Sequence, residues 1–568
     1  MDQEKRVMIA VGLSFLMLIV WRIAFPPPPE PKKPVAVQSV ARVAPPVPAT
    51  RTKAPAKSPH ASPAHRPAAL PVVTGGKAED IVVESDLYRV TFSTQGAVVK
   101  SWVLKKYRDA KEEPLDVVNG PACEALGYPM KLSLANHEEL ANKLNAAIYV
   151  PTPSGLALQA PAKIEFTYSD GKVRANKQFT FGPTYEARVE MSVFDGQSKE
   201  FLPLEVAWPG GLGDHSLPPA IEDALSQAVY GSPDNLTTVT LKKVNENQPI
   251  PGPLDIVGLE DKYFAGVFLP GPADQTFRVG RRVWTPAEWK GKDSDKPQAL
   301  FALLGSAQPK PLGFRVFVGP KARNVLRAVN PPLDSLVSFG FFKWFAEPLF
   351  IALHYIHDHV VGNYGWAIVI LTVLINLAMF PLKLKSIKSA QEMQRIAPLV
   401  KDIQDKYKQY KFNDPRKQRG NQEVMKLYQE HHINPLGGCL PMALQMPFLY
   451  GFYRVLDLPI ELRHAPWMGW IKDLSAADPY YILPIIMVVS MFIMQKMTPM
   501  ATADPAQQRM MMLMPVFFGI MFFRLASGLV LYFMVANLVG IAQQVIINKK
   551  ISPPRPLGAP PKAGATKD

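Results

Sequence analysis

One stretch, Gly362 to Leu458, constrains the chain more than any other, because two apolar runs flank a long basic segment with no globular domain between them. The basic segment, residues 383–432, holds twelve Lys or Arg against six Asp or Glu. A basic loop directly beside a membrane span is typical of the cytoplasmic side. The stretch therefore predicts two membrane helices, residues 363–382 and 433–458, joined by a cytoplasmic basic segment.

Composition favours a membrane protein over the other classes. The chain has 48% hydrophobic residues and 57 prolines, which fits neither a plain soluble enzyme nor a disordered protein. Its net charge of +15 clusters beside the apolar runs, so we expect an anionic membrane surface as partner and no nucleic-acid specificity. Cys123 and Cys439 are the two cysteines, which excludes a disulfide framework, and no motif suggests a metal or a cofactor.

The first 76 residues predict an anchor followed by a linker. Residues 1–25 contain a basic start and an apolar run, which suits a signal peptide or a first membrane helix. Four prolines follow directly and no small-residue cleavage site is present, so we favour an uncleaved anchor. Residues 26–76 are too rich in proline for helix or sheet and form the linker.

In residues 77–335 the hydrophobic pattern changes, and apolar residues recur at every second position. Ile164 to Tyr168 alternates between apolar and polar residues, turns at Asp170 and Gly171, and returns to Phe181. Many short strands with Gly and Pro turns predict an all-β sandwich. His137 and His215 are isolated, so we expect no catalytic pair in this domain.

The rest of the chain predicts a polytopic helical core. Residues 336–362 are amphipathic and suit a helix lying in the membrane interface, although a helix that closes the β domain would have a similar pattern. Asp414 and Pro415 begin a second helix within the basic segment, which gives a helical hairpin. The fold class expected is an α-helical membrane protein with an all-β extracytoplasmic domain and six transmembrane helices, at residues 1–25, 363–382, 433–458, 480–497, 510–523 and 525–547.

Orientation follows from parity. With the basic hairpin in the cytoplasm, the β domain lies outside and both termini lie inside. The tail, residues 548–568, agrees because it has five basic residues and one acid. The basic linker lies on the opposite side, and long translocated segments are largely exempt from the rule.

Polar side chains recur within or at the ends of the predicted spans. Thr372 and Asn376 are four residues apart and share one face of a helix that is otherwise Ile, Val and Leu. Burying an unpaired amide costs a few kcal/mol, so such groups face each other or water. Hydrogen bonds between helices would satisfy them one by one, but as a set they indicate a hydrated groove: Thr372, Asn376, Gln445, Gln495, Asn537, Gln543 and Gln544.

Four strings in this order resemble the conducting core of the YidC and mitochondrial Oxa insertase family: MFPLKLKSIKSAQEMQRIAPLV, NPLGGCLPMALQMPF, DLSAADPYYILPI and SGLVLYFMVANL. The likeness runs from the Met1 anchor to the basic tail, which is the arrangement of the Gram-negative members. It implies a β-supersandwich similar to sugar mutarotases for residues 77–335. It also implies a bacterial inner membrane protein with this domain in the periplasm.

The resemblance further implies a groove that opens to the cytoplasm and to lipid and holds an arginine on the first core helix. Asn376 stands at the aligned position, which removes that charge. Arg454 could substitute for it, but it lies near the outer end of its helix, where we expect it to snorkel. Our candidate groove residues are Thr372, Asn376, Gln445, Gln495, Tyr532, Phe533 and Asn537. Our candidates for docking ribosome, signal-recognition machinery or lipid headgroups, if they are not simply a solvated face, are Lys383, Lys385, Lys388, Arg395 and Lys401.

The function expected is that of a membrane protein insertase and chaperone, acting alone or with the Sec translocon on nascent integral membrane proteins. A client's polar tail would enter the wet groove and its apolar helix would leave sideways into lipid, so no bond is made or broken. A secondary transporter is the first rival, but the five core spans show no inverted repeat and no charged pair. A membrane-anchored carbohydrate-active protein is the second, and no acid of the β domain stands out as its catalyst.

Overall fold

The computed structural model describes residues 70–109, 112–214, 225–271, 274–287, 289–340, 343–410, 414–433, 440–498 and 505–550. The predicted anchor, nearly all of the linker, and the tail beyond residue 550 lie outside these residues, as do His215 and Cys439. Within the described part, Cys123 is a free, buried thiol.

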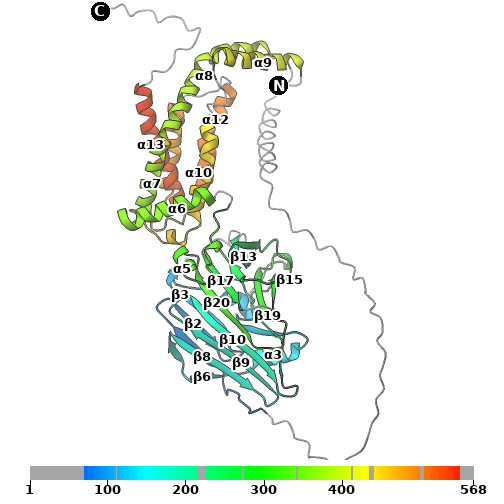
Figure 1. The fold of residues 1–568 in the computed structure, drawn as a ribbon. Helices are drawn as coiled ribbons and strands as arrows, with labels where there is room; N and C mark the ends of the chain where they lie inside the picture. The colour runs from blue at the N-terminus through cyan, green and yellow to red at the C-terminus, as the bar shows by residue number, and fades with distance from the viewer. Residues whose placement is uncertain are drawn as a thin grey trace, which may run out of the picture. The chain divides into compact units, whose positions relative to one another are not determined.

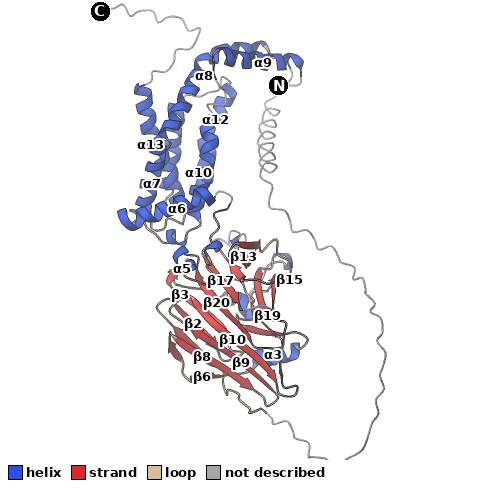
Figure 2. Ribbon diagram, viewed as in Figure 1, coloured by secondary structure: helices blue, strands red, loops and turns tan. Residues whose placement is uncertain are grey.

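Strands make up the first large part of the described chain, which we call the β domain (residues 80–320; Figures 1 and 2). They form three sheets, with the orders β4-β3-β2-β1-β7, β14-β13-β16-β17-β20-β10-β9-β8-β6 with β11 on β10, and β15-β18-β19-β12-β5. Every pair is antiparallel except β1 with β7. The strands are β1 Asp80–Glu84, β2 Tyr88–Ser93, β3 Val98–Arg108, β4 Pro114–Asp116, β5 Lys131–Leu134, β6 Val150–Thr152, β7 Ala157–Gln159, β8 Ala162–Ser169, β9 Val173–Phe181, β10 Glu186–Asp195, β11 Glu200–Phe201, β12 Leu204–Trp208, β13 Gln227–Ser232, β14 Asn235–Thr240, β15 Gln248–Ile250, β16 Ile256–Glu260, β17 Phe264–Pro270, β18 Gln275–Val283, β19 Gln298–Ser306 and β20 Leu312–Pro320.

The hairpin of β8 and β9 is the one expected from the period-two pattern. Its strands pair from Ala162 with Phe181 to Ser169 with Arg174, around the turn at Asp170 and Gly171. Side chains on one face, including Phe166 and Phe179, are buried in the domain core. The sequence thus predicted the β class and this hairpin with its turn, because one face of each strand is apolar.

Lys177, on the inward face of β9, is an unexpected member of this core. Its side chain is fully buried, and its Nζ donates to the carbonyl oxygens of Gly96 at 2.6 Å, Met130 at 2.8 Å and Ala97 at 3.3 Å. Burial lowers the pKa of Lys177 to about 7. The three carbonyls match the three N–H donors of an ammonium and offset its loss of water.

Helices dominate after the β domain. The helical core comprises α6 Lys343–Ile356 continued by the π-turn η4 His357–Val361, α7 Tyr364–Ala378, α8 Phe380–Lys406, α9 Pro415–Glu430, α10 Leu440–Asp457, α11 Ile482–Met497, α12 Pro505–Phe522 and α13 Ser527–Lys550. Asp414 caps α9 by accepting from the amide of Arg416, and Pro415 occupies the first position, as expected. The shorter elements are α2 Gly120–Leu126, α3 Glu138–Ala146, α5 Arg323–Arg327, η1 Asp293–Asp295, η2 Asp334–Leu336 and η6 Ile460–Leu462.

Few of the described helices are long enough and apolar enough to be recognised as membrane spans from these two properties alone. In the described part, residues 527–549 of α13 pass as one span, and α6 with α7 would make a second if they formed one, but they are bent by 117°. Residues 482–497 and 512–522 are apolar but shorter. The bend separates α6 from α7, as an interfacial helix followed by a span requires.

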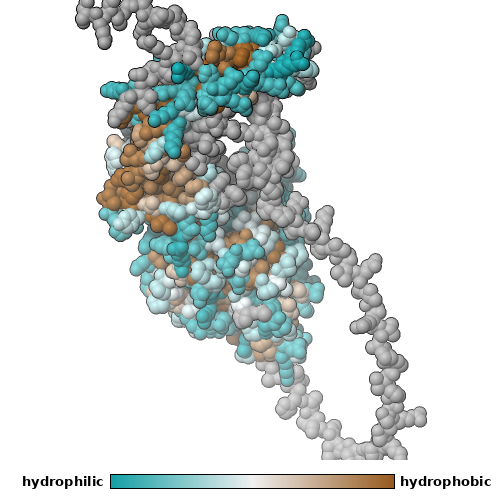
Figure 3. Space-filling view, turned by 45° about the horizontal axis from the view of Figure 1, so that its top comes forward, coloured by the Kyte–Doolittle hydropathy of each residue, from teal (hydrophilic) through white to brown (hydrophobic). Residues whose placement is uncertain are grey.

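Large apolar side chains remain exposed over the helical core, which distinguishes it from the β domain. Figure 3 shows hydrophobic residues gathered over the helices, between the hydrophilic α8–α9 hairpin and the hydrophilic β domain. Exposed apolar patches of this extent mark contact with a membrane or a partner. Members of the belt are Leu374, Leu377, Ile485, Val489, Ile493, Leu513, Phe517, Ile520, Leu538 and Ile546.

A buried ion pair joins the helical core to the β domain. Arg463, in the loop after α10, places Nη1 3.0 Å from Oδ2 of Asp214, and the two side chains are only 4% and 5% exposed. The guanidinium also donates to the carbonyl of Arg108 and lies over the rings of Tyr263 and Phe264. The β domain is therefore fixed to the helical core by specific contacts as well as by the chain.

Candidate client groove

A chain of hydrogen bonds crosses three helices of the core, and we call it the polar ladder. On α7, Thr372 Oγ1 donates to the carbonyl of Ile368 at 2.6 Å, and Asn376 Nδ2 donates to the carbonyl of Thr372 at 2.8 Å. Gln543 Nε2, on α13, donates to the main-chain carbonyl of Asn376 at 3.0 Å. Lys383 Nζ, on α8, donates to Oε1 of the same Gln543 at 3.2 Å.

The two groove candidates on α7 differ in exposure. Thr372 is fully buried and its hydroxyl bonds to its own helix, whereas Asn376 is half-buried. Both make bonds to the carbonyl four residues earlier, which is how polar side chains are satisfied within a helix. Of the two, only Asn376 therefore has exposed surface that water or a bound client segment can contact.

The remaining groove candidates lie on α10, α11 and α13. Asn537 Nδ2 donates to Ser490 Oγ at 3.2 Å and joins α13 to α11, while the Tyr532 ring stacks on Phe452 of α10 at 4.3 Å. Phe533 packs against Phe522 at 4.7 Å. Gln495 lies on the last turns of α11, and the side chain of Gln445 on α10 lies outside the described residues.

The docking candidates separate into two groups on α8. Four of them are exposed on the hairpin, namely Lys385, Lys388, Arg395 and Lys401. Lys383 is half-buried and belongs to the polar ladder. The hairpin itself is held by a small core in which Met393, Ile396 and Val400 pack against Leu427 and Tyr428.

Sequence reasoning missed two charged residues that the structure makes prominent. From the sequence we assigned Lys383 to the docking cations. Its place directly after the apolar run could have indicated that it contacts the membrane helices instead. Arg463 drew no comment, because nothing near it in sequence reveals that Asp214 lies beside it. Arg454, which we expected to snorkel, donates through Nη2 to the carbonyl of Ser338 at 2.7 Å.

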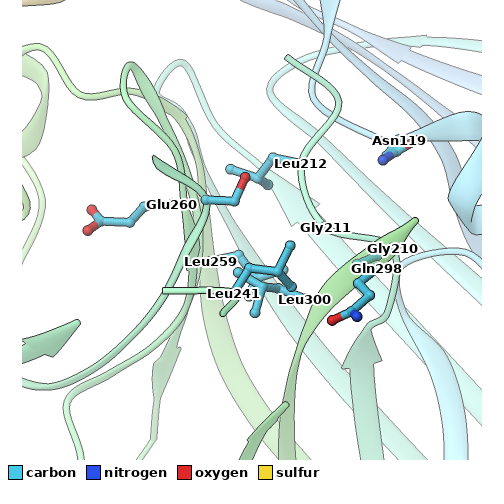
Figure 4. Close-up of a pocket in the computed structure, with 11 residues that line it drawn as sticks. Asn119, Gly210, Gly211, Leu212, Leu241, Leu259, Glu260, Gln298 and Leu300 are labelled. Atoms are coloured by element: carbon cyan, nitrogen blue, oxygen red, sulfur yellow. The ribbon is translucent and has the colours of Figure 1, made fainter. Parts of the chain in front are cut away.

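The β domain has two hollows of very different size. One cavity of about 50 Å³ is lined by Leu241, Leu259 and Leu300 together with polar groups such as Asn119 and Gln298 (Figure 4). A more open hollow of about 630 Å³ lies beside β1 and β3, where Lys100 Nζ pairs with Asp80 at 3.0 Å. Among the described residues no group of His, Cys, Asp and Glu could hold a metal ion.

Two family models match this chain in succession. Residues 80–352 match the YidC periplasmic domain, and residues 355–554 match the 60Kd inner membrane protein. A membrane protein insertase YidC of Syntrophus aciditrophicus is 34% identical over 581 residues, which cover 96% of this chain and 100% of the relative.

Solved structures are similar at lower levels. A crystal structure of an active YidC insertase covers 84% of this chain and 94% of its own, at 18% identity and a TM-score of 0.33. A galactose mutarotase-like protein from Lactobacillus casei covers 42% of this chain and 100% of its own, at 12% identity and a TM-score of 0.25. These scores are too low to carry an argument. The two matching family models and the identity over nearly the whole chain show that it belongs to the YidC family of membrane protein insertases, the family that its four motifs resemble.

Proposed function

We propose that this protein inserts client membrane proteins by admitting their polar segments to a hydrated groove around the polar ladder and releasing their apolar helices into lipid. Membership of the family makes it an inner membrane protein with a periplasmic β domain, and an insertase rather than an enzyme. Nascent integral membrane proteins are its clients, with the Sec translocon, the ribosome or signal-recognition machinery as further partners.

The observation that carries this proposal is the polar ladder inside an otherwise apolar bundle. Thr372, Asn376 and Gln543 form a continuous polar path from α7 to α13, while the outer surface of the same helices exposes the apolar belt. Moving a polar group into hydrocarbon costs several kcal/mol when it finds no partner. A path of amides and water lowers this cost for a client's tail.

Short helices support the proposal from a second direction. α11 has 16 residues and the apolar part of α12, residues 512–522, has 11, so they are about 24 Å and about 16 Å long at 1.5 Å per residue. The hydrocarbon core of a bilayer is roughly 30 Å thick. The membrane must thin beside these helices, or flanking residues must snorkel, and thinning shortens the distance that a client tail has to cross.

The topology that we propose has six spans with both termini in the cytoplasm. The hairpin of α8 and α9 and the β domain flank the apolar belt on opposite sides, which fits one cytoplasmic and one periplasmic face (Figures 1 and 3). Aromatic residues with large exposed surfaces lie on α6 and at or just before the starts of α7 and α11, as at the ends of membrane helices: Trp344, Tyr355, Trp366, Tyr480 and Tyr481.

Substitutions at Asn376 test whether hydration is what the groove supplies. Asn376→Leu removes the half-buried amide and should impair insertion, most severely for clients with polar translocated tails. Asn376→Arg should be tolerated, because a wet groove solvates the guanidinium. Both variants are compared with the parent protein at matched expression, by the fraction of client protected from protease.

Two results would contradict the proposal. Full activity of Asn376→Leu would mean that the amide only satisfies its own helix. An inactive Asn376→Arg variant that still folds would mean that the site is dry.

A further inference from the structure

The loop that follows α10 is inserted into the β domain, and we call residues 458–464 the plug loop. Ile460 of this loop is 3% exposed and belongs to the hydrophobic core of the β domain. Asp457, the last residue of α10, pairs with Lys262 at 2.9 Å. Lys262 lies in the turn between β16 and β17, so this turn, residues 261–263, is one of the points where the β domain and the helical core meet.

Asp261 begins this turn and is only half satisfied as a carboxylate. Its Oδ1 accepts from the main-chain amides of Tyr263 at 2.8 Å and Phe264 at 2.7 Å. Its Oδ2 is buried and has no hydrogen-bond partner among the described residues. An ionised oxygen in that position would lose its water and gain no donor in exchange, which is costly. A protonated carboxyl carries no charge and costs much less to bury.

The charges around Asp261 cancel one another without it. They form three ion pairs, two of which cross between the β domain and the helical core: Asp214 with Arg463, Lys262 with Asp457, and Glu260 with Lys321. Arg463 directs both Nη1 and Nη2 at Asp214, and Nη2 also donates to the carbonyl of Arg108. An ionised Asp261 would therefore be one negative charge in excess inside this junction.

Other titratable side chains near the turn do not compensate that charge. Glu461 of the plug loop is itself an acid, and burial raises its pKa. Burial also raises the pKa of Tyr107, which therefore stays neutral. His464 is exposed and lies 3.6 Å from a carboxylate of its own, Asp473.

We propose that Asp261 holds a proton while the β domain is closed on the plug loop, and that loss of this proton to alkaline periplasmic water loosens the contact. The proton removes the excess charge and the penalty on the unpartnered Oδ2. The attachment of the β domain to the helical core thus becomes tighter in acidic surroundings and weaker in alkaline ones. This inference does not depend on how clients pass through the groove.

The pKa of Asp261 agrees with this assignment. Burial, and after it the charge of Asp214, raise the pKa of Asp261 to about 7 from an ordinary 3.8. The amides of Phe264 and Tyr263 and the ammonium of Lys321 act in the opposite direction but are weaker. In the open state the carboxyl faces water and ionises at the ordinary value. The proton therefore favours closure fully below about pH 4, and this advantage is lost as the pH rises from about 4 to about 7.

The test is hydrogen exchange of the plug loop in the full-length, detergent-solubilised protein, measured by mass spectrometry at pH 5 and at pH 8. Asp261→Asn is nearly isosteric with the protonated acid, keeps an oxygen acceptor for the two amides and cannot ionise. Asp255→Asn is the matched control, because it removes an exposed acid just before β16. Comparing each variant with the parent at the same pH cancels the intrinsic pH dependence of exchange.

We expect the ratio of the parent's exchange rate to that of Asp261→Asn to rise at least about tenfold between pH 5 and pH 8, since the open state has lost its proton over most of this range and the closed state has not. Asp255→Asn should exchange as the parent does at both pH values. A constant ratio, or a plug loop that exchanges faster in Asp261→Asn than in the parent at pH 8, would overturn the inference. An equal rise with Asp255→Asn would do the same.

The parent protein alone supplies a second measurement, which needs no variant to fold. Exchange of the plug loop relative to that of β10, residues 186–195, should rise between pH 5 and pH 8. A fixed ratio of these two segments would contradict the proposed proton at Asp261 even if Asp261→Asn failed to fold.

Discussion

Asp214→Ala is the most informative change at the junction of the two parts, because it removes one half of a buried ion pair. Asp214 and Arg463 are 5% and 4% exposed, and two of the bonds between them measure 3.0 and 3.3 Å. Breaking such a pair from one side costs about 3–5 kcal/mol, since the remaining charge is left buried. The carbonyl of Arg108 and the rings of Tyr263 and Phe264 stay in contact with the guanidinium. We therefore expect the free energy of unfolding to fall by about 3 kcal/mol, the lower end of that range.

The assay is urea unfolding of the detergent-solubilised protein, followed by tryptophan fluorescence, to which Trp102 and Trp208 in the core of the β domain contribute because each is only 1% exposed. Arg463→Met serves as the reciprocal single variant. The double variant Asp214→Ala with Arg463→Met removes both charges and should recover most of the loss, as replacement of a whole buried pair often does.

The same reasoning predicts that deleting the β domain destabilises the helical core less than Asp214→Ala does. A variant that keeps the first span but lacks about residues 78–310 loses Asp214, Arg108, Tyr263 and Phe264 together, so Arg463 meets water. It should still fold in the membrane and support insertion. An Asp214→Ala protein within about 0.5 kcal/mol of the parent would refute the argument, as would a deletion variant that reaches the membrane and inserts nothing.

Two further predictions concern the orientation of the protein in the membrane and the stability of the β domain at low pH. With both termini in the cytoplasm, a thiol reagent added to intact cells should label a cysteine placed at Gly171 and should not label one placed at Lys411. The opposite pattern would mean that the proposed orientation is reversed. Partial burial acts to raise the pKa of Asp170, but the Lys143 ammonium and the amides of Val173 and Lys172 outweigh it and lower the pKa to about 2 from an ordinary 3.8. A depressed carboxyl pKa stabilises the fold above the ordinary value, so the β domain should lose on the order of 1–2 kcal/mol as the pH falls from about 4 to 2, after discounting for the half-exposed Lys143, and Asp170→Asn should flatten this step in a pH series of urea titrations.

The sequence predicted the parts of this molecule that depend on local pattern. The hairpin at Asp170 and Gly171 and the cap at Asp414 follow from residues close together in the chain, and the structure confirms both. The inward turn of Lys383 depends on Gln543, 160 positions away, and no local pattern encodes that contact. The pairing of Arg463 with Asp214 spans 249 positions and was unpredictable for the same reason.

The buried Lys177 has a consequence for how the β domain assembles. Lys177 lies on β9 of the largest sheet, Gly96 and Ala97 precede β3 of the second, and Met130 precedes β5 of the third. One side chain is thus bonded to backbone beside strands of all three sheets, and its full set of acceptors exists only when all of them are in place. A partly assembled domain would leave this amine without some of its acceptors, outside the environment that satisfies it in the folded state. Lys177 therefore couples the three sheets into one cooperative unit, which discourages any one of them from opening alone.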